Sequence, residues 1–164
     1  MFELRPLSTS AIPGALAKAE RYRLLNEGGQ AESICLDVLA VDPDNQDALA
    51  MLILAITDQF RDEGTAAHVG RAERLLPQLR DPYTQAYYGA LIHERRARAA
   101  RDAGRAGMAY EWLLAALHGF DRAMALRPAH NDDAVLRWNA CVRALAGLPA
   151  PAAADRAESA IMSE

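Results

Sequence analysis

The chain has 164 residues, which suits one domain or one short repeat array, and 51% of them are hydrophobic, so a sizeable core can form. Its formal net charge of -4 argues against a general nucleic-acid-binding protein. The two cysteines, Cys35 and Cys141, stand apart, with no CxxC pair and no histidine at ligand spacing, which predicts two reduced, buried thiols and no metal site.

Apolar residues recur at helical spacing along most of the chain, whereas the alternation typical of strands is nearly absent. Proline and glycine separate the helical segments, as at Gly28, Pro43 and Pro128. In chain order, the predicted helices cover about residues 13–26, 30–41, 46–60, 65–76, 82–103, 108–126 and 131–145.

The same pattern divides the chain into three parts. Residues 1–11 are predicted to form an N-terminal segment, residues 12–146 a helical repeat domain, and residues 147–164 a linker with a mobile C-terminal tail.

Two of the predicted helices stand out by their composition. The helix expected at about residues 46–60 is apolar on most sides, which predicts that it is sandwiched between neighbouring helices. The helix expected at about residues 82–103 begins with tyrosines and apolar residues, whereas its second half reads HERRARAARDAG and offers only alanine and charge.

Two segments, CLDVLAVDPDNQDAL and FDRAMALRPAHNDDA, each place a helix end, a proline and a polar cap before the next helix. Helix pairs of this kind cannot bury their apolar faces alone and therefore stack on one another. At these residues the chain resembles the tetratricopeptide family, since Ala116, Phe120, Ala123 and Pro128 occupy that family's small, aromatic, small and proline positions.

The resemblance covers roughly residues 12–146, and its repeats are degenerate. Ala31 and Pro43 match in the first hairpin, whereas Ile53 and Trp138 stand where the family has a small residue. The resemblance implies an all-α fold, an α-solenoid of about three to four stacked tetratricopeptide-like hairpins.

The resemblance also implies that partners bind on the concave surface lined by the first helix of each hairpin. The candidate contacts on that surface are Asp47, Asp58, Tyr83, Tyr87, His93 and Asn139. Tyrosine suits such a contact because its side chain is large, stiff and half polar. The alternative for the tyrosines is that they merely pack between hairpins.

A second candidate contact is the run HERRARAARDAGR, which holds five arginines in a stretch, residues 83–127, with seven basic and four acidic side chains. Arg95 and Arg96 are the candidate residues, because guanidinium groups bind carboxylates in bidentate pairs and so suit an acidic partner segment. The alternative is a solvated helix face on which Glu94 and Arg98 form a local ion pair.

We therefore expect a protein–protein interaction module, an adaptor or scaffold that binds a protein or peptide partner, with no cofactor and no nucleic-acid or membrane partner. The alternative is a self-associating structural protein whose hairpin ends stack into a homo-oligomer. No catalytic residues are predicted: His93-Glu94 resembles the start of an HExxH motif, but residue 97 is alanine, so an enzyme is not expected.

The N-terminus, MFELRPLSTS, has no apolar run of signal-peptide length, and no stretch approaches the roughly 18 apolar residues of a membrane span. The sequence therefore predicts a cytoplasmic protein. The preference for arginine over lysine and the many alanines are typical of a bacterial source with a GC-rich genome.

Overall fold

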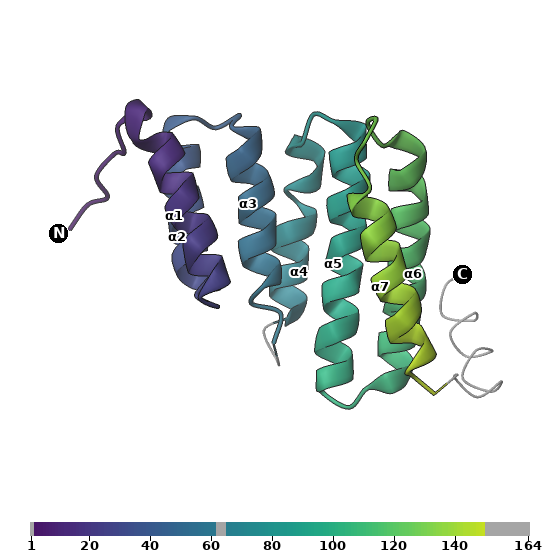
Figure 1. Cartoon of the computed structure of the whole chain (residues 1–164). Helices are drawn as coiled ribbons and strands as arrows, with labels where there is room; N and C mark the ends of the chain where they lie inside the picture. Colours follow the sequence, from purple (N-terminus) through teal and green to yellow (C-terminus); the bar gives the residue numbers. More distant parts are fainter. Residues whose placement is uncertain (1, 62–64, 150–164) are drawn as a thin grey trace.

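The computed structural model describes residues 2–61 and 65–149, and every regular element within these stretches is a helix (Figure 1). The α-helices are α1 (Ile12–Leu24), α2 (Gly28–Val41), α3 (Gln46–Thr57), α4 (Thr65–Glu73), α5 (Pro82–Asp102), α6 (Ala106–Leu126) and α7 (Asp133–Ala146). Two short 3-10 helices, η1 (Thr9–Ala11) and η3 (Leu76–Gln78), precede α1 and α5. The prediction of an all-α fold is confirmed for this part of the chain, whereas the predicted mobility of the tail falls on residues 150–164, outside it.

The helices form a row two layers deep (Figure 1). The front layer holds α1, α3, α5 and α7, and the back layer holds α2, α4 and α6. Each helix packs against the next one along the chain, most extensively α5 against α6. All four front-layer helices run in the same direction, so their C-terminal ends lie at the same edge of the row.

Local sequence signals set the helix boundaries. Asn45 caps α3 by accepting a hydrogen bond from the Ala48 backbone N–H at 2.9 Å, and Asp81 caps α5 in the same way. The helix α4 ends at Glu73, three residues earlier than predicted, because Pro77 has no N–H to donate to the Glu73 carbonyl. Pro77 lies in η3 instead.

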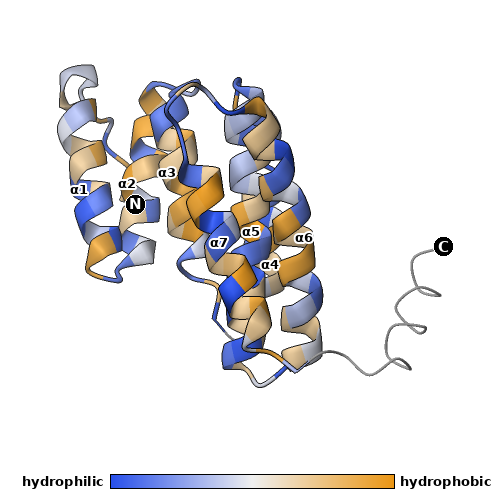
Figure 2. Ribbon diagram, turned by 45° about the vertical axis from the view of Figure 1, so that its right-hand side comes forward, coloured by the Kyte–Doolittle hydropathy of each residue, from blue (hydrophilic) through white to orange (hydrophobic). Residues whose placement is uncertain are grey.

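The helices are amphipathic, and Figure 2 shows hydrophobic and hydrophilic residues sharing the same helix in every layer. None of the helices in the described stretches is at once long and apolar enough to cross a bilayer.

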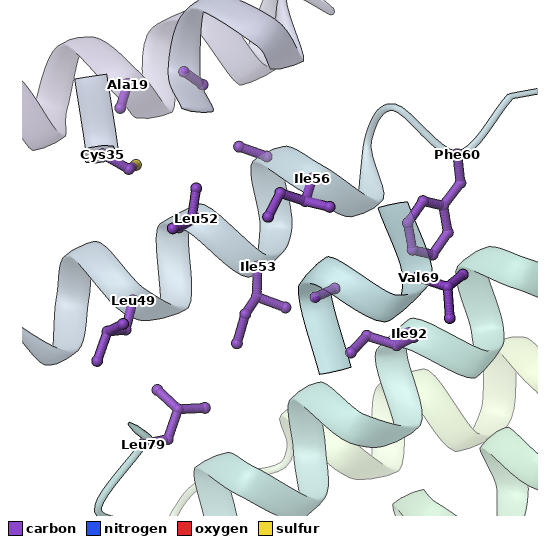
Figure 3. Close-up of a cluster of buried hydrophobic side chains, with 13 residues drawn as sticks. Ala19, Cys35, Leu49, Leu52, Ile53, Ile56, Phe60, Val69, Leu79 and Ile92 are labelled. Carbon is purple, nitrogen blue, oxygen red and sulfur yellow. The ribbon is translucent and has the colours of Figure 1, made fainter. Parts of the chain in front are cut away.

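The helix α3 lies at the centre of one core cluster, as its all-round apolar composition predicts. It packs against α1, α2, α4 and α5. Figure 3 shows Leu49, Leu52, Ile53 and Ile56 of α3 pointing in several directions, toward side chains of these neighbours. Because it is covered on nearly all sides, α3 holds the first half of the row together.

A second core cluster lies between α5, α6 and α7. Small residues on α6 let it approach α5 closely, and Gly119 lies directly against Ala90. Phe120, on the same helix, is fully buried. These two clusters fix the relative positions of α3 and α5, the two helices that contribute most of the polar residues described next.

Candidate functional site

A pocket of about 660 Å³ opens between the C-terminal halves of α1, α3 and α5. We call it the arginine pocket. The charged residues that line it are Arg23, Arg61, Arg95, Arg98, Asp58 and Asp102. Among the described residues that line it, four guanidinium groups and two carboxylates give an excess of positive charge.

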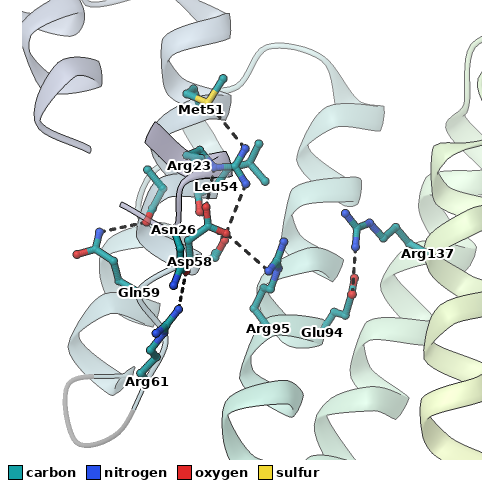
Figure 4. Close-up of polar contacts among 12 residues, drawn as sticks. Arg23, Asn26, Met51, Leu54, Asp58, Gln59, Arg61, Glu94, Arg95 and Arg137 are labelled. Atoms are coloured by element: carbon teal, nitrogen blue, oxygen red, sulfur yellow. Dashed lines mark hydrogen bonds and ion pairs between the residues drawn. The ribbon is translucent and has the colours of Figure 1, made fainter. Parts of the chain in front are cut away.

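Asp58, directly after α3, holds two of these arginines (Figure 4). Its carboxylate lies 2.7 Å from Nε of Arg23 on α1 and 3.6 Å from Nη1 of Arg95 on α5. All three side chains are 14–17% exposed, so this contact is largely shielded from solvent. One carboxylate therefore balances only one of the two positive charges that meet there.

The guanidinium of Arg95 is incompletely satisfied. Its Nε is buried and has no hydrogen-bond partner within residues 2–61 and 65–149. Burial lowers the pKa of Arg95, and the neighbouring Arg98 lowers it further. Arg95 stays protonated all the same, because its ordinary pKa lies so far above neutral pH. It is a cation that an additional carboxylate would stabilise.

Arg61 and Arg98 form the outer part of the arginine pocket. Arg61 donates from Nη2 to Oδ1 of Asn26 at 2.6 Å, and Asn26 has a φ of 64°, the left-handed conformation that asparagine tolerates after a helix end. Arg98 is exposed, and in the described part of the chain no carboxylate pairs with it. Its expected local partner Glu94 pairs elsewhere, so Arg98 remains available for an external anion.

Glu94 points to the opposite side and pairs with Arg137 of α7, 3.3 Å away (Figure 4). Burial lowers the pKa of Arg137, but the Glu94 carboxylate and the Tyr87 hydroxyl outweigh this effect, and the pKa is raised overall. The ion pairs Arg23–Asp58–Arg95 and Glu94–Arg137 therefore cross the whole front layer, from α1 to α7.

Three predicted contact residues meet in a second pocket of about 340 Å³, nearer the N-terminal ends of α3 and α5. Asp47, Tyr83 and Tyr87 line it together. The rings of Tyr83 and Tyr87 stack with centroids 5.8 Å apart, and Tyr87 also meets Phe120 edge-on at 5.8 Å. Tyr83 is buried and donates its hydroxyl to Oδ1 of Asn131 at 3.1 Å, so packing accounts for most of its surface.

Two predicted contacts, His93 and Arg96, lie on the opposite side of α5, away from the arginine pocket. The His93 ring stacks on Trp112 of α6 with centroids 5.5 Å apart, and the Arg96 guanidinium lies 3.3 Å from the centre of the same indole. Arg96 also pairs with Glu73 of α4 at 3.7 Å. Burial and the Arg96 charge lower the pKa of His93.

The helical rotation of about 100° per residue explains this separation. Counted from Tyr87, Arg98 is about 20° away around α5, whereas His93 is about 120° away and Arg96 about 180° away. A helical wheel would therefore have placed Arg98, which sequence reasoning missed, on the face of Tyr87. Asn139 is exposed on α7 and lines neither of the two front-layer pockets.

Arg23 and Arg61 were also missed, and no pattern in the sequence singles them out. Arg23 lies in the last turn of α1 and Arg61 in the segment after α3, and the packing of these helices brings them together. Within the stretches described here, no group of three or more His, Cys, Asp or Glu side chains could hold a metal ion. No protein-family model, no curated protein and no solved structure matches this chain.

Proposed function

We propose that the chain is a tetratricopeptide-like α-solenoid of about three to four hairpins that binds an acidic segment of a partner protein. The observation that carries this proposal is the arginine pocket, where α1, the segment that follows α3, and α5 bring four arginines into one recess. The two-layer row and the matches to the tetratricopeptide pattern support the solenoid.

The chemistry of the arginine pocket favours a carboxylate-bearing ligand. Arg98 is exposed, while Arg95 keeps a buried Nε without a partner among the described residues. Planar guanidinium groups recognise carboxylates in bidentate pairs, and this contact is stronger in a partly shielded recess than in open water. Asp47, Tyr83, Tyr87 and Asn139 remain predicted contacts for the rest of a bound segment, whereas we assign His93 and Arg96 no role in this pocket.

The test uses a fluorescein-labelled hexaglutamate peptide and fluorescence anisotropy at low salt. We expect Arg98→Gln to weaken binding about threefold to tenfold, because it removes one charge-assisted contact. Arg122→Gln is the matched control: Arg122 is an exposed arginine that lines a pocket on the far side of α5, so the same change in charge leaves binding within about twofold.

Equal weakening by the two substitutions would show that the peptide senses only net charge, and would contradict a defined site. The same conclusion follows if hexaglutamate does not bind at all at a low ionic strength, where screening is weak.

Self-association is a second candidate, favoured by exposed apolar side chains at both ends of the row. Leu24 is 83% exposed at the end of α1, and Leu136 is 65% exposed on α7. Ends of helical stacks that are not capped by polar residues can pair with another copy. Sedimentation velocity from micromolar to about 100 micromolar concentration tests this, and the sedimentation coefficient of a monomer at every concentration excludes it.

A further inference from the structure

The described part of the chain ends near Arg98, whose side chain also lines the arginine pocket. Leu148, two residues after α7, lines a pocket of about 220 Å³ together with Arg98 and Arg101 of α5 and with side chains of α6 and α7. Arg98 also lines the arginine pocket. The two pockets therefore share Arg98, and the described chain ends at Pro149, one residue after Leu148.

The residues that follow carry the complementary charge. Residues 150–164 hold three carboxylates, Asp155, Glu158 and Glu164, against one basic residue, Arg156. The described residues that line the arginine pocket include four arginines and two aspartates. An extended chain covers about 3.3 Å per residue, so fifteen residues reach up to about 50 Å, which is ample to pass around Arg98.

Because residues 150–164 are covalently attached to the helical row, even a weak interaction between their carboxylates and the arginine pocket is significant. A segment tethered by a short flexible linker is present at an effective concentration of roughly millimolar at its own site. At that concentration, an interaction with a Kd of about 1 mM occupies the pocket about half of the time.

We propose that residues 150–164 are an intramolecular ligand of the arginine pocket and compete there with the acidic partner segment. This inference rests on the proposed function and describes how binding of the acidic partner segment would be regulated. A partner must displace the chain's own carboxylates, so it binds more weakly than the pocket alone would allow.

The first experiment measures the labelled hexaglutamate peptide on the full chain and on the triple variant Asp155→Asn/Glu158→Gln/Glu164→Gln. We expect the variant to bind about threefold to tenfold more tightly, because the competitor has lost its charge. The difference should vanish in about 0.5 M salt, where charges are screened over a few ångströms.

A second triple variant controls for net charge. Glu3→Gln/Asp37→Asn/Asp121→Asn removes the same number of carboxylates from exposed positions that do not line the arginine pocket. We expect this variant to bind hexaglutamate within about twofold of the unmodified chain. If both triple variants gain affinity equally, or if neither gains any, the tail does not compete and the inference is wrong.

The second experiment locates the tail without any added peptide. A nitroxide attached at Ser159→Cys in the full chain should broaden the amide signals of Asn26 and Ala103, beside the arginine pocket, far more than that of Ala15, near the N-terminal end of α1. The native thiols are buried and stay unlabelled. Adding the three tail substitutions should abolish the broadening.

The two experiments separate the failure of each proposal. If hexaglutamate binds neither the unmodified chain nor the tail variant, the proposed function fails, and the nitroxide still decides whether the tail lies at the pocket. If hexaglutamate binds the unmodified chain and the tail variant equally, and the nitroxide broadens no amide signals beside the arginine pocket, the proposed function stands and the tail proposal is overturned.

Discussion

At the scale of single residues, the closest approach between α5 and α6 depends on Gly119. A Cβ added there would lie 2.7 Å from the Cβ and 3.0 Å from the Cα of Ala90, and no flexible side-chain end is present that could move aside. We expect Gly119→Ala to lower the free energy of unfolding by about 1–3 kcal/mol, despite the better helix propensity of alanine. Urea denaturation followed by circular dichroism measures this change.

Gly89, inside α5, is the matched control for that substitution. Its added Cβ would meet only Cδ1 of Leu76, at an ordinary contact distance of 3.7 Å. Gly89→Ala should therefore raise the free energy of unfolding by about 0.5–1 kcal/mol. A loss of similar size at both glycines would contradict the packing at Gly119.

The two buried thiols make stability depend on alkaline pH. Burial raises the pKa of Cys35 and of Cys141 from 9.0 to about 12. Above pH 9 the unfolded chain loses these protons while the folded chain keeps them, so rising pH favours unfolding. The free energy of unfolding should fall by about 1.4 kcal/mol per pH unit for each thiol between pH 9 and the folded pKa.

This prediction is checked by urea denaturation at pH 8 and pH 10, with Cys35→Ala/Cys141→Ala as the comparison. The decrease between the two pH values should be about 3 kcal/mol larger for the unmodified chain than for the double variant. Equal decreases would mean that the thiols titrate at their ordinary pKa in the folded state.

At the scale of elements, the start of α5 depends on one carboxylate. Oδ2 of Asp81 accepts hydrogen bonds from the backbone N–H of Thr84 at 2.8 Å and from its hydroxyl at 2.6 Å. Asp81→Ala should lower the free energy of unfolding by about 1 kcal/mol, as for other helix caps. Asp44→Ala, which removes a pair with Arg80 whose side chains are 81% and 68% exposed, should change it by less than about 0.5 kcal/mol.

The contribution of the Asp81 cap to stability also depends on pH. The hydrogen bonds from the Thr84 hydroxyl and backbone hold the pKa of Asp81 below 3.8. Its contribution to stability is therefore complete above pH 3.8 and is lost as the pH falls through the lower, folded pKa. In Asp81→Ala this acid-dependent loss should be absent from denaturation curves measured at pH 5 and below.

At the scale of the whole molecule, Asp58 connects three front-layer helices through Arg23 and Arg95. Asp58→Asn leaves two partly buried guanidinium groups without their shared counter-charge, so it should lower the free energy of unfolding by about 1–3 kcal/mol. Asp102→Asn is the control, because its pair with Arg101 is exposed and should matter by less than about 0.5 kcal/mol. Thermal or urea denaturation distinguishes the two variants.

The sequence by itself determined the helices and their order. Apolar spacing, the proline and glycine breaks and the cap residues all act within a few neighbouring residues, so they can be read without knowing the fold. The difference at the end of α4 is also local, since Pro77 removes the hydrogen bond that a longer helix would need. Helical rotation could likewise have separated Arg98 from His93 and Arg96.

Only the tertiary structure decided where charges gather. Arg23 lies in α1, Arg61 in the segment after α3 and Arg98 in α5, and no local pattern says that packing brings them into one pocket. The same holds for Asp58, whose partners lie on α1 and α5. Helix formation depends on residues that are neighbours along the chain. A pocket instead depends on which helix faces are buried between helices, and the packing of the whole row determines those faces.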